Sequence, residues 1–357
     1  MAHSVREAAD AIARGEVVIV TDDDDRENEG DLICAASLCS TEKMAFIIRN
    51  SCGIVCAPIT AADARRLNLQ PMVAANEAPL GTAFTVSVDV KYGLTTGISA
   101  EQRANTVRAL ADRAMGSSDF VRPGHVFPLI AREGGVLMRS GHTEAAVDLC
   151  LLAGLPPVGV ICELTNDDGT VMAGAQIEAF AKKHGLKRTS VADLIAFRQA
   201  REKIVERMRT FEVIGTSGPL TAHAYVTPFD SVQHYAFVYG DVGDGRDVPA
   251  RLHRVDVVAD VIAGGESIHK TLAGFKKEGR GVLIFLREGT AGVPAEAPGA
   301  ERESESRRSR EWREIGLGAQ ILRDLGISSI RLRTGRPMTY VGLSGFGIEI
   351  ASMEGLE

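Results

Sequence analysis

Residues Glu16–Asp31 read EVVIVTDDDDRENEGD, a short β-branched run that passes directly into a dense acidic segment. Glu16–Val20 predicts a strand, because β-branched residues favour an extended backbone. Thr21–Asp31 holds seven acids and a single arginine, Arg26, which stands beside Glu27. Ligands of α/β proteins bind near the carboxyl ends of strands, and carboxylates suit Mg²⁺ or Mn²⁺ better than zinc. The alternative is a solvated acidic loop that binds nothing.

The rest of the first half alternates between helical and strand-like patterns. Apolar spacing and capping residues predict helices over Val5–Arg14, Ala100–Met115, from a cap at Thr143 through Leu152, over Gly174–His184 and over Ser190–Val205. A buried apolar run predicts a strand over Val158–Cys162. This mixture indicates an α/β or α+β fold.

The composition is that of a globular protein. At about 150 residues per domain, 357 residues correspond to roughly two domains. The net charge of −7 lacks the basic character of a nucleic-acid binder. No stretch approaches the roughly 18 apolar residues of a membrane-spanning helix, and the N-terminus lacks the apolar core of a secretory signal. We therefore expect a cytoplasmic protein that binds neither nucleic acid nor membrane.

The pattern changes near Glu206–Val213, where a charged helix gives way to alternating residues, and we place the domain boundary there. The second half predicts strands over Leu220–Pro228, Tyr235–Gly240, Gly281–Leu286 and Ser329–Arg333, with helices over Ser267–Lys277 and Arg313–Leu325. Gly289–Arg310 is rich in Gly, Pro, Ser and mixed charge, which predicts a loop or disordered insertion.

The six cysteines all lie in the first half of the chain. They are Cys34, Cys39, Cys52, Cys56, Cys150 and Cys162. Most stand in apolar runs, so we interpret them as small buried hydrophobic side chains in a reducing compartment. No cysteine follows Cys162, and the second half therefore cannot build a metal site from cysteines.

Two histidines stand in glycine-flanked segments of the first half: His125 in RPGHVFP and His142 in RSGHTE. Backbone N–H groups at a helix N-terminus, with Arg139 and the Thr143 hydroxyl, suit a phosphate. Glu163 closes the predicted buried strand, where partial desolvation favours an acid–base role. Spacing alone leaves a structural role for the histidines equally open.

Five segments together resemble 3,4-dihydroxy-2-butanone 4-phosphate synthase, in that family's order and within about residues 1–203. They are VVIVTDDDDRENEGDLI, TTGISAEQRANTVRAL, RPGHVFPL, GGVLMRSGHTEAAVDL and GVICELTNDDGTVM. The resemblance implies an α+β synthase domain over residues 1–205 and a homodimer with active sites near the subunit interface. It implies conversion of D-ribulose 5-phosphate to 3,4-dihydroxy-2-butanone 4-phosphate and formate in riboflavin biosynthesis, with Mg²⁺ or Mn²⁺.

The resemblance also implies residue roles. Glu27 and His142 would ligate the metal, and His125 and Glu163 would be catalytic. The residues implied to hold the substrate are Arg26, Glu27, Asp31, Arg139, Ser140, Gly141, His142, Thr143 and Glu163, with Arg139 and Thr143 on its phosphate. The first step removes a proton beside a ketone, and a Lewis-acid metal would stabilise the enediolate. Loss of water, rearrangement and release of formate then require further proton transfers.

Residues 208–357 resemble GTP cyclohydrolase II, which implies a C-terminal α/β domain. The matching segments are KKEGRGVLIFLRE, REIGLGAQILRDLGISSIRLRT and VGLSGFGIEI. That family holds zinc with three cysteines, whereas the corresponding stretch here, Arg251–Phe275, contains none. We therefore expect no zinc and no ordinary GTP cyclohydrolase II activity.

Three alternatives for the second half stay open. The protein could be a bifunctional enzyme that retains GTP cyclohydrolase II activity. The second half could be a module that binds a nucleotide, supports dimerisation or regulates the synthase. A differently built metal site could also use His253, His269, Asp256 and Glu266.

Overall fold

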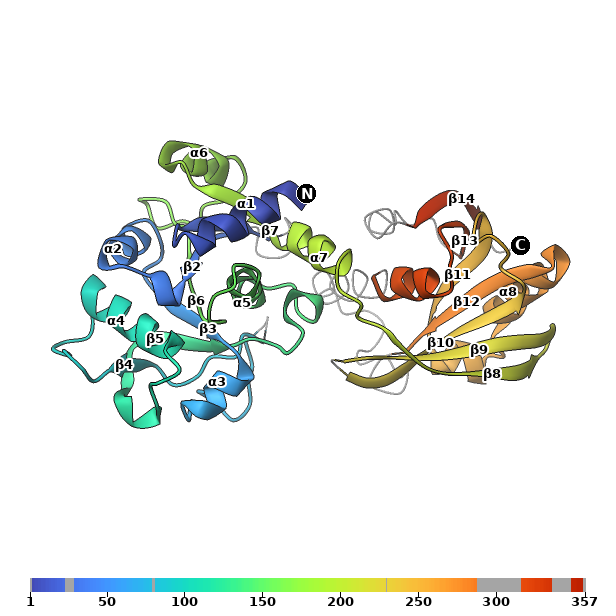
Figure 1. Ribbon diagram of the computed structural model, residues 1–357, viewed down its shortest axis with the longest axis horizontal. Coiled ribbons are helices and arrows are strands. Elements are labelled where there is room, and N and C mark those ends of the chain that lie inside the picture. Colours follow the sequence, from blue (N-terminus) through green and yellow to red (C-terminus); the bar gives the residue numbers. More distant parts are fainter. Residues whose placement is uncertain are drawn as a thin grey trace. The chain divides into compact units, whose positions relative to one another are not determined.

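The computed structural model describes residues 2–22, 29–78, 81–228, 230–287, 316–335 and 348–355. The chain divides into two compact units, Met1–Phe197 and Arg198–Glu357. Each unit is built around its own seven-stranded sheet (Figure 1). This architecture of two domains with mixed helices and strands confirms the predicted fold class. None of the helices in the described ranges has the length and apolar character needed to cross a membrane.

The sheet of the first unit has the strand order β4-β5-β3-β6-β2-β1-β7. The strands are β1 (Val18–Thr21), β2 (Gly30–Ala35), β3 (Cys56–Ile59), β4 (Val88–Val90), β5 (Phe120–Ile130), β6 (Gly159–Glu163) and β7 (Lys187–Ser190). Every residue of β2 and β3 is buried. A strand covered on both faces needs apolar residues at consecutive positions, which is why β2 reads LICA after its first two residues.

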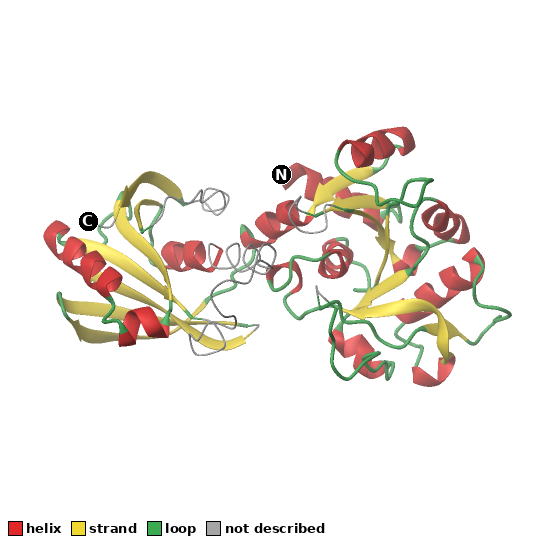
Figure 2. Ribbon diagram, turned by 180° about the vertical axis from the view of Figure 1, so that it is seen from behind, coloured by secondary structure: helices red, strands yellow, loops and turns green. Residues whose placement is uncertain are grey.

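Helices cover this sheet (Figure 2). They are α1 (Ala2–Ala13), α2 (Thr41–Arg49), α3 (Ala61–Arg66), α4 (Ala100–Ala111), α5 (His142–Leu152), α6 (Ala175–His184) and α7 (Val191–Gln199). Helices α1 and α5 pack against each other and against β2. Helices α2, α4 and α6 instead share a core with Leu32 and Cys34 of β2. Alternate residues of a strand point to opposite faces, so β2 lies in the middle of the domain.

The second unit has the strand order β14-β13-β11-β12-β10-β9-β8. Its strands are β8 (Glu206–Gly215), β9 (Gly218–Thr227), β10 (Asp230–Gly240), β11 (Val248–Arg254), β12 (Arg280–Leu286), β13 (Ser329–Thr334) and β14 (Glu349–Gly355). The neighbours along β8-β9-β10-β12 pair antiparallel. The neighbours along β12-β11-β13-β14 pair parallel. Helix α8 (Glu266–Glu278) packs on β12 through the buried Phe275 and Leu283. Residues 316–324 are also helical.

The start of α5 differs from the prediction. Gly141 is its N-cap, with an extended backbone at φ −115°, and Thr143 already belongs to the first turn. The Gly141 carbonyl accepts the first helical hydrogen bond, from the Ala145 amide at 3.0 Å, so the helix starts at His142. The Arg139 and Glu144 side chains pack against the Gly141 backbone, and a Cβ there would require them to shift. This places the first backbone N–H groups of α5 next to those charged side chains.

Helix α7 ends at Gln199, not at Val205 as the sequence predicts. The Gln320 side chain donates to the carbonyl oxygens of Gln199 (3.1 Å) and Glu202 (2.6 Å) and accepts from the Ile204 amide (2.7 Å). A long-range contact within the second unit therefore satisfies backbone groups that a continued helix would have paired. The predicted loop Gly289–Arg310 lies outside the described residues.

Candidate active site

The site begins in the middle of the first sheet, where β2 and β6 are neighbours. Asp31 on β2 lies directly opposite Glu163 on β6 in the antiparallel pair. Side chains of directly opposite residues lie on the same face of a sheet. Asp31 is 2% exposed and Glu163 is half-buried. The sheet register therefore brings together two predicted site residues that are far apart in the sequence.

His142 joins this pair from the first turn of α5. Its side chain is 6% exposed, and its Nδ1 is 3.8 Å from Asp31 Oδ1. Helix α5 packs against β2, β3 and β6, which holds the helix start at the strand that carries Asp31. Carboxylate oxygens suit Mg²⁺ and Mn²⁺, and imidazole is a common further metal ligand. The donors present here therefore fit the predicted divalent cation.

The residues before His142 place the Arg139 guanidinium at the N-terminus of α5, paired with a buried carboxylate. Arg139 Nη1 donates to Oε2 of the buried Glu144 at 2.7 Å. A Cβ on Gly141 would lie 2.3 Å from Arg139 Nη1 and 2.9 Å from Glu144 Oε2. Thr143 is buried in the first turn, and Ser140 is half-buried. A fixed guanidinium beside helix N-terminal amides is an arrangement that can bind a phosphate.

His125, on β5, is held by a residue that the sequence did not single out. Asp89 on β4 is 2% exposed, and its Oδ1 accepts from the His125 amide at 2.9 Å. Its Oδ2 lies 2.7 Å from His125 Nδ1. A carboxylate on Nδ1 orients the ring and leaves Nε2 for chemistry. The His125 side chain is 40% exposed, so a substrate can reach it. The only signal in the sequence is an acid inside the apolar alternation VSVDV.

Arg103 on α4 links the two parts of the site. The residue is buried, and its Nη1 donates to the Gly53 carbonyl at 3.0 Å. Burial lowers the pKa of Arg103, and the nearby groups of Cys162 and Asp89 act in the opposite direction. The Arg103 guanidinium therefore interacts with Cys162, which precedes Glu163, and with Asp89, which contacts His125.

The cysteines depart from the prediction at one position. All six lie in the described ranges and are free thiols, but Cys52 is exposed while the other five are buried. The Cys52 thiol donates to Glu163 Oε2 at 2.8 Å and stands 3.6 Å from the Cys162 sulfur. An accessible thiol thus touches the carboxylate to which the sequence assigns acid–base chemistry.

Arg26 and Glu27 lie outside the described residues, in the connection between β1 and β2. Two hydrogen bonds join the described ends of this connection: Asp22 N to Glu29 O at 3.3 Å, and Glu29 N to Asp22 Oδ1 at 2.9 Å. The connection therefore starts and ends beside the strand that carries Asp31. The roles of Arg26 and Glu27 stay predictions.

His253 and His269 of the second unit have different hydrogen-bond partners. His253 Nε2 is 2.9 Å from Asp260 Oδ2, and burial lowers the pKa of His253 below its ordinary value. His269 Nδ1 instead lies 3.1 Å from Thr216 Oγ1. The sequence leaves open a metal site built from His253, His269, Asp256 and Glu266. Within the part of the chain that the structure describes, these four residues do not form a group that could hold a metal ion.

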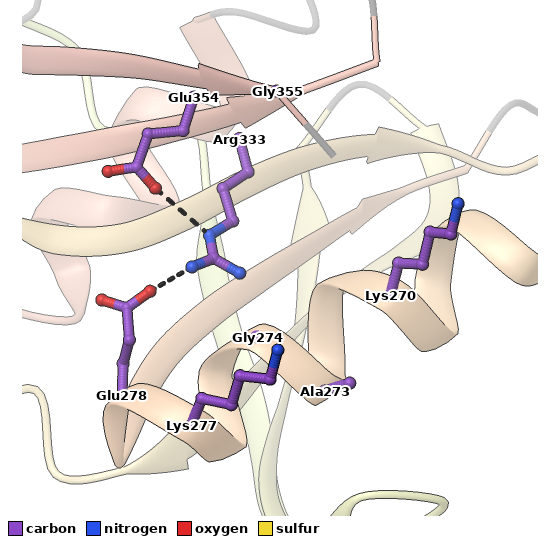
Figure 3. Close-up of a pocket in the computed structure, with 8 residues that line it drawn as sticks. All are labelled: Lys270, Ala273, Gly274, Lys277, Glu278, Arg333, Glu354 and Gly355. Atoms are coloured by element: carbon purple, nitrogen blue, oxygen red, sulfur yellow. Dashed lines mark hydrogen bonds and ion pairs between the residues drawn. The ribbon is translucent and has the colours of Figure 1, made fainter. Parts of the chain in front are cut away.

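A pocket of about 580 Å³ lies beside α8 in the second unit. Figure 3 shows Arg333 of β13 pointing between Glu278 and Glu354, and it forms ion pairs with both. Lys270 pairs with Glu266 at 3.1 Å. The two Arg333 pairs join α8 to strands β13 and β14, whereas the Lys270–Glu266 pair lies within α8. Arg333, Glu278 and Glu354 therefore have a structural role.

Comparisons with known proteins agree with this division of the chain. The model of the family described as 3,4-dihydroxy-2-butanone 4-phosphate synthase matches residues 6–197. The model described as GTP cyclohydrolase II matches residues 206–354.

Three similar proteins illustrate the relationship. "Bifunctional riboflavin biosynthesis protein RIBA 1, chloroplastic" of Arabidopsis thaliana is 44% identical over 97% of this chain and 68% of its own length. A structure described as RibBX, a two domain 3,4-dihydroxy-2-butanone 4-phosphate synthase from A. baumannii, has a TM-score of 0.84. It is 36% identical and covers 98% of this chain and 99% of that one. A 3,4-dihydroxy-2-butanone 4-phosphate synthase in complex with two magnesium ions has a TM-score of 0.54 at 45% identity. It covers 55% of this chain and 97% of its own.

The chain therefore belongs to the 3,4-dihydroxy-2-butanone 4-phosphate synthase family, with a GTP cyclohydrolase II-like domain behind the synthase domain. It is a 3,4-dihydroxy-2-butanone-4-phosphate synthase of riboflavin biosynthesis. This confirms the family resemblance and the enzyme class that the sequence segments indicate.

Proposed function

We propose that the site around Asp31, His142 and Glu163 converts D-ribulose 5-phosphate to 3,4-dihydroxy-2-butanone 4-phosphate and formate. The observation that carries the proposal is the register of β2 and β6, which sets Asp31 opposite Glu163 with His142 3.8 Å from Asp31. An oriented histidine, His125, and a phosphate cradle at the start of α5 complete the set of groups that this reaction requires.

Glu27 and His142 would hold Mg²⁺ or Mn²⁺. The described donors, a buried imidazole beside the Asp31 carboxylate, fit such a cation. When bound, the cation supplies Lewis-acid stabilisation of negative charge on the substrate oxygens. The relative in complex with two magnesium ions supports this assignment.

The chain's own residues bind the substrate and move its protons. Arg139 and the Thr143 hydroxyl, with the amides at the start of α5, hold the phosphate, because a helix N-terminus attracts anions. Glu163 and His125 exchange protons with substrate carbon and oxygen atoms, the former at its carboxylate and the latter at Nε2. Asp89 stabilises the charge on His125 when it takes up a proton. The residues that would contact the sugar hydroxyls and backbone of the substrate are Arg26, Asp31, Ser140 and Gly141.

The overall reaction balances without a further reactant. The five-carbon sugar phosphate yields the four-carbon phosphate and one molecule of formate. Water that leaves early in the reaction is taken up again when formate is released. Several acid–base groups and no covalent nucleophile are therefore needed.

Synthase activity is assigned to residues 1–205, and residues 208–357 are proposed to lack GTP cyclohydrolase II activity. The second half contains no cysteine, and thiolates are the ligands that the related enzymes use for zinc. A bifunctional enzyme is the second candidate, because a relative that covers most of this chain carries that name. Purified protein that consumes GTP would favour it. We also propose a cytoplasmic homodimer, which sedimentation analysis and microscopy of the tagged protein would test.

Metal dependence tests the main proposal. Purified full-length protein should release formate from ribulose 5-phosphate, lose this activity in EDTA and regain it on adding excess Mg²⁺ or Mn²⁺. Formate release that persists in EDTA contradicts the metal assignment. The absence of formate with either metal contradicts the function.

A further inference from the structure

We propose that Cys52, Cys162 and Glu163 form a second metal site, which takes a thiophilic divalent cation such as Zn²⁺ or Cd²⁺ and thereby withdraws the Glu163 carboxylate from the reaction. Among the residues that the structure describes, these three offer ligand atoms that all lie within 4.8 Å of one another. The effect on the reaction rests on the proposed role of Glu163, whereas the binding itself does not.

The separation of the ligand atoms suits a tetrahedral ion. With metal–sulfur bonds of about 2.3 Å, two sulfur ligands of zinc stand about 3.8 Å apart. The sulfurs of Cys52 and Cys162 are 3.6 Å apart. Glu163 Oε2 is 2.8 Å from the Cys52 sulfur, the length of a hydrogen bond, so this oxygen would move outward by less than one ångström when a metal replaces the proton.

The strands supply this arrangement. Ser51 and Leu164 form an antiparallel bridge, and the Cys52 amide donates to the Glu163 carbonyl at 2.9 Å. Cys52 therefore sits beside the end of β6, which carries Cys162 and Glu163. Cys52 is exposed and Cys162 is buried, so an ion would enter from the solvent side past Cys52. Two thiolates and a carboxylate leave the fourth position for water.

Groups around the buried sulfur support it as a ligand. The Ser51 hydroxyl oxygen lies 3.0 Å from Cys162 Sγ and 2.6 Å from the Ile47 carbonyl, so its one proton can turn to the sulfur once that is a thiolate. In the free protein the Cys162 thiol donates to the Ile54 carbonyl at 3.2 Å, and the buried Arg103 interacts electrostatically with Cys162. Donors around a thiolate ligand orient it and stabilise its charge. The hydrogen bond with Cys162 lowers the pKa of Cys52, while the same bond and burial raise that of Cys162. The second proton would leave when the metal binds, as is usual for thiol ligands.

This site differs in chemistry from the one that holds Mg²⁺ or Mn²⁺. Sulfur ligands select soft or borderline ions, whereas carboxylates select Mg²⁺ and Mn²⁺. Excess Mg²⁺ should therefore not compete at the cysteine pair. The chain also contains a natural control, because Cys34 and Cys39 form another pair of neighbouring thiols that is entirely buried and lacks a nearby described carboxylate ligand.

The test is a Cd²⁺ titration of the reduced, full-length protein in excess Mg²⁺, followed by the ultraviolet charge-transfer absorption of thiolate–cadmium bonds. The wild type should develop this band at one equivalent. Cys52→Ser and Cys162→Ala should both lose it, and Cys34→Ala should keep it. No band in the wild type, or an equal band in Cys52→Ser, overturns the proposed site.

Inhibition is measured separately. In excess Mg²⁺, Zn²⁺ should inhibit formate release by the wild type and inhibit Cys52→Ser far less, relative to each protein's own uninhibited rate. Equal inhibition of the two proteins overturns the link to Glu163 even if the band depends on Cys52. A protein that shows the Cys52-dependent band but no formate release under any condition contradicts the proposed function and leaves the metal site standing.

Discussion

Asp89 holds His125 at two points: one carboxylate oxygen accepts from the His125 amide at 2.9 Å, and the other lies 2.7 Å from the ring Nδ1. This double contact fixes both the backbone and the imidazole of the residue. Asp89 is a positioning residue, because it acts on the substrate through His125.

Asp89→Asn should lower kcat for formate release by up to about 10²–10⁴-fold, the range of a general acid–base contribution. The amide can present its NH₂ group to Nδ1, which reverses the preferred tautomer. The pH profile of kcat should change shape, which a purely structural defect would not cause. Asp119→Asn is the matched control, since the half-buried Asp119 accepts from the Tyr92 hydroxyl and the Gly116 amide and does not contact His125. Equal activity of Asp89→Asn and the wild type contradicts the assignment.

Glu163→Gln should reduce kcat by about 10²–10⁴-fold while the protein stays folded, because the amide keeps the shape of the side chain but cannot take up a proton. Steady-state formate release and circular dichroism measure the two effects. Glu178→Gln, on the exposed side of α6, serves as the control. If Glu163→Gln retains most of the wild-type kcat, Glu163 is not an acid–base group.

Gly141→Ala should raise KM for ribulose 5-phosphate more than it lowers kcat. The new Cβ would lie 2.3 Å from Arg139 Nη1, so the guanidinium must move away from the proposed phosphate site. Gly116→Ala is a suitable control, because the nearest atom to its Cβ would be 3.9 Å away. A KM unchanged from wild type would show that Arg139 does not hold the phosphate where we place it.

The stability of the second unit should depend on pH through His253. Burial lowers the pKa of His253 below its ordinary value of 6.5, so the unfolded chain takes up a proton more readily than the folded one. The stabilisation from this residue is complete above pH 6.5 and is lost as the pH falls below it. Urea unfolding, followed by hydrogen exchange of peptides from β11 and α8, should show this loss.

His253→Gln should flatten that pH dependence, although it also removes the contact with Asp260 and lowers the overall stability. The exposed His269 provides the comparison, and His269→Gln should leave the slope as in the wild type. A slope that is the same in His253→Gln and the wild type would exclude His253 as its source.

The local sequence patterns predict where helices and strands lie, but they do not predict the long-range contacts between them. The apolar run before Glu163 and the segment RSGHTE before α5 could be interpreted without a structure, because strand burial and helix starts leave short-range signals. The early end of α7 could not, since it depends on Gln320, which lies more than a hundred residues further along the chain.

The residues of the candidate site also fall into two groups, those that the sequence predicts and those that only the structure shows. Asp31, His142 and Glu163 stand in recognisable segments, and the structure brings them together. Asp89 and Arg103 act through long-range contacts and carry no distinctive motif. Cys52 stands in an apolar run that favours burial, yet it is exposed beside Glu163.

The most direct measurement is the amount of formate released for each ribulose 5-phosphate consumed by the purified full-length protein with Mg²⁺. The account predicts one formate per sugar phosphate, and formation of the four-carbon phosphate in equal amount. Consumption of the sugar phosphate without formate, or no consumption at all, would contradict the central claim.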